Sequence, residues 1–77
     1  MESLEDVFRG ALEIEESEDV YSLRYGIFPT WDSVGHMVLV AALEKNFGAK
    51  LTMGQILDIE TFDDAKRLLI SQGLLGE

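Results

Sequence analysis

The stretch from residue 37 to residue 43 reads MVLVAAL, an uninterrupted apolar run near the middle of a chain of only 77 residues. Asp32, of a type that favours helix starts, precedes this run, and Gly48, of a type that ends helices, follows it. These flanking residues predict a helix from residue 33 to residue 47. Because apolar side chains go all the way round this helix, we expect other elements to contact it on more than one side, at the centre of a helical bundle.

Two further amphipathic helices are predicted on either side of this central one. Residues 3–14 carry apolar side chains at helical spacing, and Ser3 and Asp6 have the spacing of a capping box. Thr61 and Asp64 repeat that spacing before a last helix, which we expect Gly73 to close. The side chains expected to be buried are Leu4, Val7, Phe8, Ala11 and Leu12 in the first helix, and Phe62, Ala65, Leu68 and Leu69 in the last.

The remaining segments are a short helical piece at residues 53–59 and a long loop at residues 15–30, which contains Gly26 and the only proline, Pro29. Loops of this length in small domains are usually functional or held by their own apolar residues. The residues expected to pack inward are Val20, Leu23, Ile27 and Phe28. The predicted fold is all-α: a small four-helix bundle with three main helices, one short helix and a long loop between the first and second, in a single domain of residues 1–77.

Composition excludes several classes of function. The chain has no cysteine, so disulfides, thiolate metal sites and a cysteine nucleophile are absent. Its net charge of −9 repels phosphate backbones and anionic lipid, and favours partners rich in lysine and arginine. The N-terminus lacks the basic and apolar regions of a secretory signal, and the apolar run is too short to span a bilayer. We therefore expect a soluble, cytoplasmic monomer that binds no nucleic acid and does not insert into membranes.

Ser33 stands at the start of the central helix but lacks the surroundings of a catalytic serine. The only histidine, His36, lies three positions later on the same helix, and no G-x-S-x-G elbow surrounds the serine. The first turn of a helix does offer free backbone N–H groups and the positive end of the helix dipole, which stabilise a phosphate. Ser33 is therefore well placed to carry a phosphate ester, and the chain is not expected to be an enzyme.

The residues around Ser33 carry a family resemblance. The stretch DSVGHMVLVAALEKNFGAKLT resembles the signature of acyl carrier and peptidyl carrier proteins, in which Asp-Ser-(Leu/Ile/Val) opens the second helix and a Leu-Glu pair followed by Phe closes it. The matching positions are Asp32, Ser33, Val34, Leu39, Leu43, Glu44 and Phe47. The resemblance continues through Leu51, Ile59, Thr61 and Ala65, and so covers essentially the whole chain.

This resemblance implies that Ser33 is the attachment point of 4′-phosphopantetheine, whose terminal thiol carries acyl or aminoacyl groups as thioesters. The thiol of the prosthetic group would account for a carrier that has no cysteine of its own. A long tether lets one intermediate reach several active sites at high effective concentration. The implied partners are a phosphopantetheinyl transferase, which uses coenzyme A, and acyl-loading and acyl-processing enzymes.

Partner recognition is expected to depart from the family pattern. The second helix of the family usually presents several acidic residues, but the corresponding positions here are Gly35, Val38 and Lys45, with only Glu44 kept. We expect Val34, Met37 and Val38 to form an apolar docking strip with Glu44 beside it. Acidic residues that steer encounters are concentrated in the first helix and loop: Glu2, Glu5, Asp6, Glu13, Glu15, Glu16, Glu18 and Asp19.

Simpler interpretations stay open for several residues. Ser33 and Asp32 can serve only to start the helix, although the resemblance adds contact between Asp32 and the transferase or its metal-bound coenzyme A. His36 is interpreted as an exposed helix residue without function, with a place beside the phosphodiester as the other option. Trp31 and Met37 are expected to be packing residues, with partner contact second.

Two functions remain in view, together with several pathways. One is the phosphopantetheine carrier; the other is an unmodified, carrier-like acidic docking subunit for a basic protein partner. Fatty acid, polyketide and nonribosomal peptide synthesis, and dedicated lipid or amino-acid transfer systems, all use this bundle. The WDSVGH sequence departs from the Gly-x-Asp-Ser-Leu form associated with primary fatty acid synthesis, which favours a specialised pathway.

Overall fold

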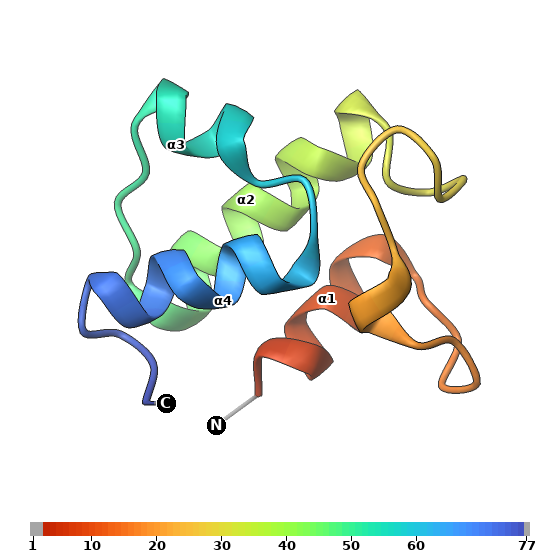
Figure 1. Ribbon diagram of the computed structural model, residues 1–77, viewed down its shortest axis with the longest axis horizontal. Coiled ribbons are helices and arrows are strands. Elements are labelled where there is room, and N and C mark those ends of the chain that lie inside the picture. Colours follow the sequence, from red (N-terminus) through yellow and green to blue (C-terminus); the bar gives the residue numbers. More distant parts are fainter. Residues whose placement is uncertain (1–2, 77) are drawn as a thin grey trace.

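Residues 3–76 are described in a computed structural model, and they form the predicted all-α bundle (Figure 1). In chain order the elements are α1 (Leu4–Leu12), the 3₁₀ turn η1 (Val20–Ser22), α2 (Ser33–Phe47), α3 (Met53–Asp58) and α4 (Phe62–Ser71). No strand occurs among these residues; a single isolated bridge pairs Arg24 with Thr61. The prediction of three main helices, one short helix and a long loop after the first is confirmed.

Capping residues set the ends of these helices. A reciprocal capping box opens each of α1, α3 and α4, with the pairs Ser3 and Asp6, Thr52 and Gln55, and Thr61 and Asp64. Asp32 caps α2, and Gly48 ends it in the left-handed region at φ 70°, as predicted. The first helix ends earlier than residue 14, because Glu13 adopts a left-handed conformation with φ 54°.

An aromatic cluster lies at the centre of the core. Phe8 of α1 makes edge-to-face contacts with Trp31, at 5.6 Å between ring centroids, and with Phe62 of α4, at 4.9 Å. Such contacts add to the large apolar area that these side chains bury. Trp31 is fully buried, so its predicted packing role is confirmed. The cluster joins α1, the segment before α2 and α4 in one core.

Apolar side chains of the long loop between α1 and α2 pack against the core. Val20 and Leu23 are buried and Phe28 is half-buried, which confirms the inward packing predicted for Val20 and Leu23. The same prediction is wrong for Ile27, which is 76% exposed. Ile27 lies at the tip of a tight turn, where its amide and that of Phe28 donate to the carbonyl of Arg24 at 3.2 and 3.1 Å. The turn directs the tip residue away from the core.

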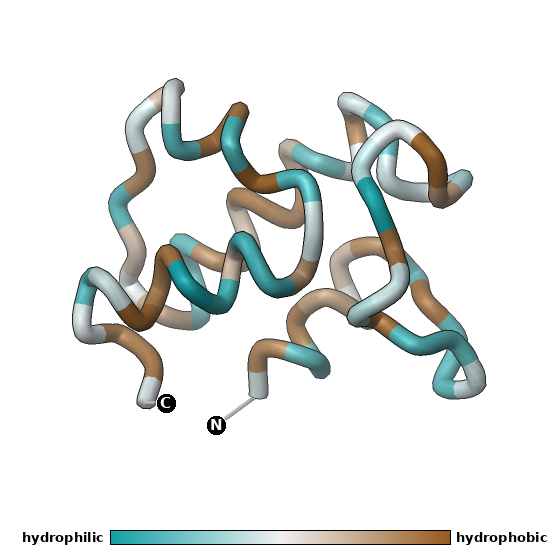
Figure 2. Tube along the Cα trace, in the orientation of Figure 1, coloured by the Kyte–Doolittle hydropathy of each residue, from teal (hydrophilic) through white to brown (hydrophobic). Residues whose placement is uncertain are grey.

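α2 buries one face and leaves another open. His36, Leu39, Val40 and Leu43 are buried at the i, i+3, i+4 and i+7 positions of one face. Away from this face Met37 is 54% exposed, so the prediction that Met37 packs inward is wrong. α1 and α3 both contact α2, in line with the expectation of contacts on more than one side. Figure 2 shows the apolar colour continuing along the middle of α2. Within residues 3–76, no helix combines the length and hydropathy needed to cross a bilayer.

Candidate functional site

Ser33 is the first residue of α2, and its side chain is exposed. The preceding residue provides the helix cap: Oδ1 of Asp32 accepts from the amide of Gly35 at 2.8 Å, which confirms its predicted capping role. The hydroxyl of Ser33 makes no hydrogen bond with another residue in the described part of the chain. The hydroxyl is therefore accessible to solvent, and no base among residues 3–76 is hydrogen-bonded to it.

Gly35, two residues after Ser33, allows the loop to pass close to the helix. A Cβ at this position would overlap the backbone carbonyl oxygen of Thr30 and would lie 3.3 Å from Cδ2 of Leu12. Only glycine accommodates a backbone at this separation without displacement. The close approach brings the end of the loop against the first turn of α2, and so sets how Ser33 is presented.

His36 is buried behind this first turn, with only 7% of its surface exposed, so the prediction of an exposed histidine is wrong. Its Nδ1 accepts from the indole Nε1–H of Trp31 at 2.9 Å, and its Nε2 lies 2.7 Å from the carbonyl oxygen of Ile56 in α3. A carbonyl oxygen only accepts, so Nε2 carries the proton and the ring is the neutral Nε2–H tautomer. Both nitrogens are engaged within the fold, which leaves neither for a phosphodiester on Ser33.

The sequence contained a signal for this burial. His36 precedes Leu39, Val40 and Leu43 by three, four and seven positions, which places it on the buried face of α2. A histidine on the buried face of a helix requires hydrogen-bond partners for both ring nitrogens. Trp31 could have been anticipated as one of them, whereas the carbonyl of Ile56 depends on where α3 packs.

The predicted docking strip is exposed on α2. Val34 is 72% exposed and Val38 is 48% exposed, on the same side of the helix as Met37. Glu44 is also exposed, two turns beyond Met37 on that side. α3 adds two exposed apolar side chains, those of Met53 and Leu57, each 69% exposed. The α2 surface beside Ser33 is thus apolar, with a single carboxylate at its far end.

Acidic side chains are exposed elsewhere, on α1 and the turn that follows it. Glu15, Glu16 and Glu18 are all exposed in this turn, whereas Glu2 lies outside the described residues. The guanidinium of Arg9 donates to the backbone carbonyls of Glu15 and Glu18 at 2.6 and 3.0 Å, and so ties the turn to α1. The carboxylates are displayed by a backbone that is itself held in place.

Hollows lie against several of these elements in the described part of the chain. One, of about 220 Å³, lies beside the first turn of α2, between Val34, Gly35 and Val38 on one side and Leu12 and Thr30 on the other. Asp32 also lines this hollow.

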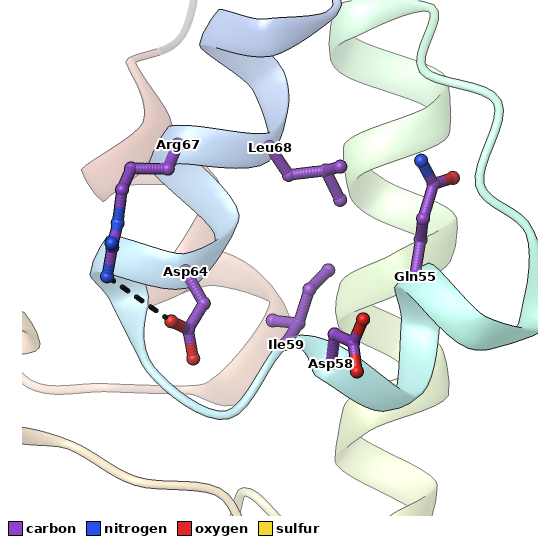
Figure 3. A pocket seen from close by; sticks show the side chains of 6 residues that line it. All are labelled: Gln55, Asp58, Ile59, Asp64, Arg67 and Leu68. Atoms are coloured by element: carbon purple, nitrogen blue, oxygen red, sulfur yellow. Dashed lines mark ion pairs between the residues drawn. The ribbon is translucent and has the colours of Figure 1, made fainter.

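The larger hollow, of about 260 Å³, is lined by α3 and α4 together with Ile59, and includes none of the predicted site residues. Figure 3 shows Ile59 and Leu68 pointing into it, while Arg67 turns toward Asp64, with 3.6 Å between Nη2 and Oδ1. Asp64 already accepts from the amides of Glu60 and Thr61, so its carboxylate serves the start of α4. Nothing in this hollow links it to Ser33.

No protein-family model, curated protein or solved structure matches the chain in sequence or structure comparisons. The resemblance to carrier proteins therefore stays a prediction from the motif that begins at Asp32 and from the helical layout around it. Among residues 3–76, no group of three histidine, aspartate or glutamate side chains is arranged to hold a metal ion.

Proposed function

We propose that this protein is a carrier that holds acyl or aminoacyl intermediates as thioesters on a 4′-phosphopantetheine arm attached to Ser33. The observation that carries the proposal is the setting of Ser33: an exposed hydroxyl on the first turn of α2, directly after the capping Asp32, in a segment that reads DSVGHMVLVAALEKNF. Asp32 caps the helix by itself, so the serine is not needed for that purpose.

The surroundings of Ser33 suit a phosphodiester. The first turn of a helix presents free amides and a partial positive charge, which favour an attached phosphate. Because no base in the described part of the chain is hydrogen-bonded to the hydroxyl, we assign its deprotonation to a separate phosphopantetheinyl transferase, which supplies the arm from coenzyme A. The arm brings the thiol that the chain, with no cysteine, does not have. The protein is a non-catalytic carrier in this proposal.

Partners of the loaded arm are proposed to dock on α2. Val34, Met37 and Val38 offer apolar contact next to the attachment point, and Glu44 offers one carboxylate. Acyl-loading and acyl-processing enzymes of a specialised cytoplasmic pathway are the proposed partners, and a monomer leaves this surface free for them. The absence of further acidic residues on α2 favours enzymes whose docking face is itself apolar.

Intact mass spectrometry tests the attachment. The purified protein is incubated with coenzyme A and a broad-specificity phosphopantetheinyl transferase, and we expect one adduct of the mass of a phosphopantetheine group. The adduct disappears in Ser33→Ala and persists in Ser17→Ala, a control at an exposed serine in the acidic turn. An adduct that persists in Ser33→Ala would place the arm elsewhere.

A second function is favoured by charge. With a net charge of −9 and acidic side chains gathered on α1 and its following turn, the same bundle suits a docking subunit that is never modified and binds a basic protein. A mass that stays unchanged after treatment with the transferase, in a sample shown to be folded, would favour this function over the carrier.

A further inference from the structure

Three separate parts of the fold meet at the imidazole of His36. Its Nδ1 accepts from Trp31 in the segment before α2, and its Nε2–H donates to Ile56 in α3. The rings of Tyr25 and Trp31 lie against it, with centroid distances of 4.9 and 6.2 Å. We infer that His36 is a positioning residue that holds α3 against the first turn of α2, and thereby shapes the surface on which partners of Ser33 dock.

α3 has few other attachments. It has six residues, of which none is buried; only Gln55 and Ile56 are even half-buried. Its capping box joins Thr52 to Gln55 and so lies within the helix. Within residues 3–76, the bond from His36 to Ile56 is the only hydrogen bond that joins α3 to another helix. Short helices are marginal without tertiary contacts, so the position of α3 depends strongly on this bond.

The hydrogen bond from Trp31 also orients the imidazole. Because Trp31 is fully buried and donates to Nδ1, the indole selects the tautomer that has its proton on Nε2. That proton points at the backbone of α3, at a short distance of 2.7 Å. A side chain that only filled the same space would not hold α3, since no acceptor of α3 would be satisfied.

The consequence for recognition rests on the proposed function. His36 lies one turn beyond Ser33, so the bond to Ile56 holds α3 against the turn of α2 that begins at Ser33. The exposed Met53 and Leu57 of α3 are then presented at a defined position relative to Val34 on α2. Release of α3 would leave Ser33 and α2 unchanged but would alter the surface available to a partner.

Amide variants of His36 separate its two hydrogen bonds. In His36→Gln the side-chain Nε2 replaces the donor to Ile56, whereas in His36→Asn the Oδ1 replaces the acceptor for Trp31. His36→Phe keeps a ring and removes both. Hydrogen exchange of the α3 amides is measured by NMR in unmodified protein, with the amides of Ala65 to Leu69 in α4 as the internal reference. The indole Nε1–H resonance of Trp31 reports the other bond.

We expect the α3 amides to exchange roughly tenfold faster in His36→Phe and His36→Asn, with α4 unchanged and the wild-type rate largely restored in His36→Gln. The indole resonance should shift in His36→Gln and His36→Phe but stay near its wild-type position in His36→Asn. Equal exchange in α3 for all four proteins would overturn the inference. So would acceleration of α3 and α4 by the same factor, since that indicates only a loss of global stability.

A second measurement connects the bond to recognition. With the transferase that modifies the wild type, His36→Phe should raise KM several-fold at nearly unchanged kcat, and His36→Gln should restore KM. Unchanged KM in His36→Phe with released α3 would show that partners do not use this surface. If the wild type is not modified at all, the carrier proposal fails, while the exchange result still decides whether His36 holds α3.

Discussion

The carbonyl oxygen of Thr30 lies in the space that a Cβ on Gly35 would occupy. The contact joins the last part of the long loop to the first turn of α2, on the two sides of Ser33 in the sequence. Substitution of Gly35 by any other residue forces either the loop or the helix to move. The glycine is therefore explained by packing, independently of any comparison with the acidic residues that carrier proteins have on this helix.

Gly35→Ala should lower the free energy of unfolding by about 1–3 kcal/mol, the usual cost of overpacking a closed site. Gly10 supplies the matched control, because it lies on the exposed side of α1 with nothing within 4 Å of a Cβ at that position. Gly10→Ala should stabilise the protein by about 0.5–1 kcal/mol through helix propensity. Urea denaturation of the two variants decides the matter: equal effects in both would show that Thr30 does not restrict residue 35.

Substitutions of Asp32 can test its capping hydrogen bond separately from its negative charge. Asp32→Ala should cost about 0.5–2 kcal/mol, because the amide of Gly35 loses its acceptor at 2.8 Å. Asp32→Asn keeps an acceptor oxygen and should retain most of that stability, as measured by thermal and urea unfolding.

The same pair tests whether Asp32 contacts the transferase. If it does, Asp32→Asn should be modified more slowly than the wild type while remaining equally stable. Wild-type modification rates in Asp32→Asn would mean that this side chain only caps the helix.

Much of the fold was predictable because it is encoded locally. The start and end of α2 follow from Asp32 and Gly48, and the openings of α1 and α4 follow from capping boxes that can be read three residues apart. The end of α1 was less predictable. Ile14 continues the apolar character of the helix, but Glu13 adopts a left-handed conformation, which is uncommon for a residue other than glycine.

The errors concern residues whose apolar or polar character does not show which way the side chain faces. Ile27 is apolar, yet the turn closed by Gly26 and Trp31, with 2.8 Å between amide and carbonyl, places it outside. Met37 lies in a continuous apolar run, which conceals which side of the helix faces the core. The role of His36 depends on a carbonyl of α3, twenty residues away, and no local pattern specifies that contact.

Ser33 should matter for modification but not for stability. Its side chain is exposed and Asp32 supplies the cap, so Ser33→Ala should change the free energy of unfolding by less than about 0.5 kcal/mol. Leu39→Ala, on the same helix but fully buried, should cost about 2–5 kcal/mol. Urea denaturation measures the free energy of unfolding of both variants. A serine variant as unstable as the leucine variant would assign Ser33 a structural role instead.

The acidic turn after α1 should affect how fast partners arrive. Glu15, Glu16 and Glu18 are exposed, and substitution of all three by glutamine keeps the backbone carbonyls to which Arg9 donates. We expect association with the native acyl-loading enzyme to slow by about three- to tenfold at low salt, with a weaker dependence on ionic strength. Stopped-flow or surface-binding kinetics at several salt concentrations measure this. Dissociation should change little, because these charges act mainly before contact.

The apolar strip should affect how long the complex lasts. Val38 is half-exposed on α2, close enough to Ser33 to be covered by an enzyme that reaches the arm. Val38→Asp would bury an unpaired charge in an apolar contact, and we expect dissociation to become roughly tenfold faster with association nearly unchanged. Met53→Asp, at an exposed residue of α3, tests whether the contact extends to that helix. An unchanged lifetime of the Val38→Asp complex, or tighter binding as expected for a partner that prefers an acidic helix, would show that the strip formed by Val34, Met37 and Val38 is not the docking surface.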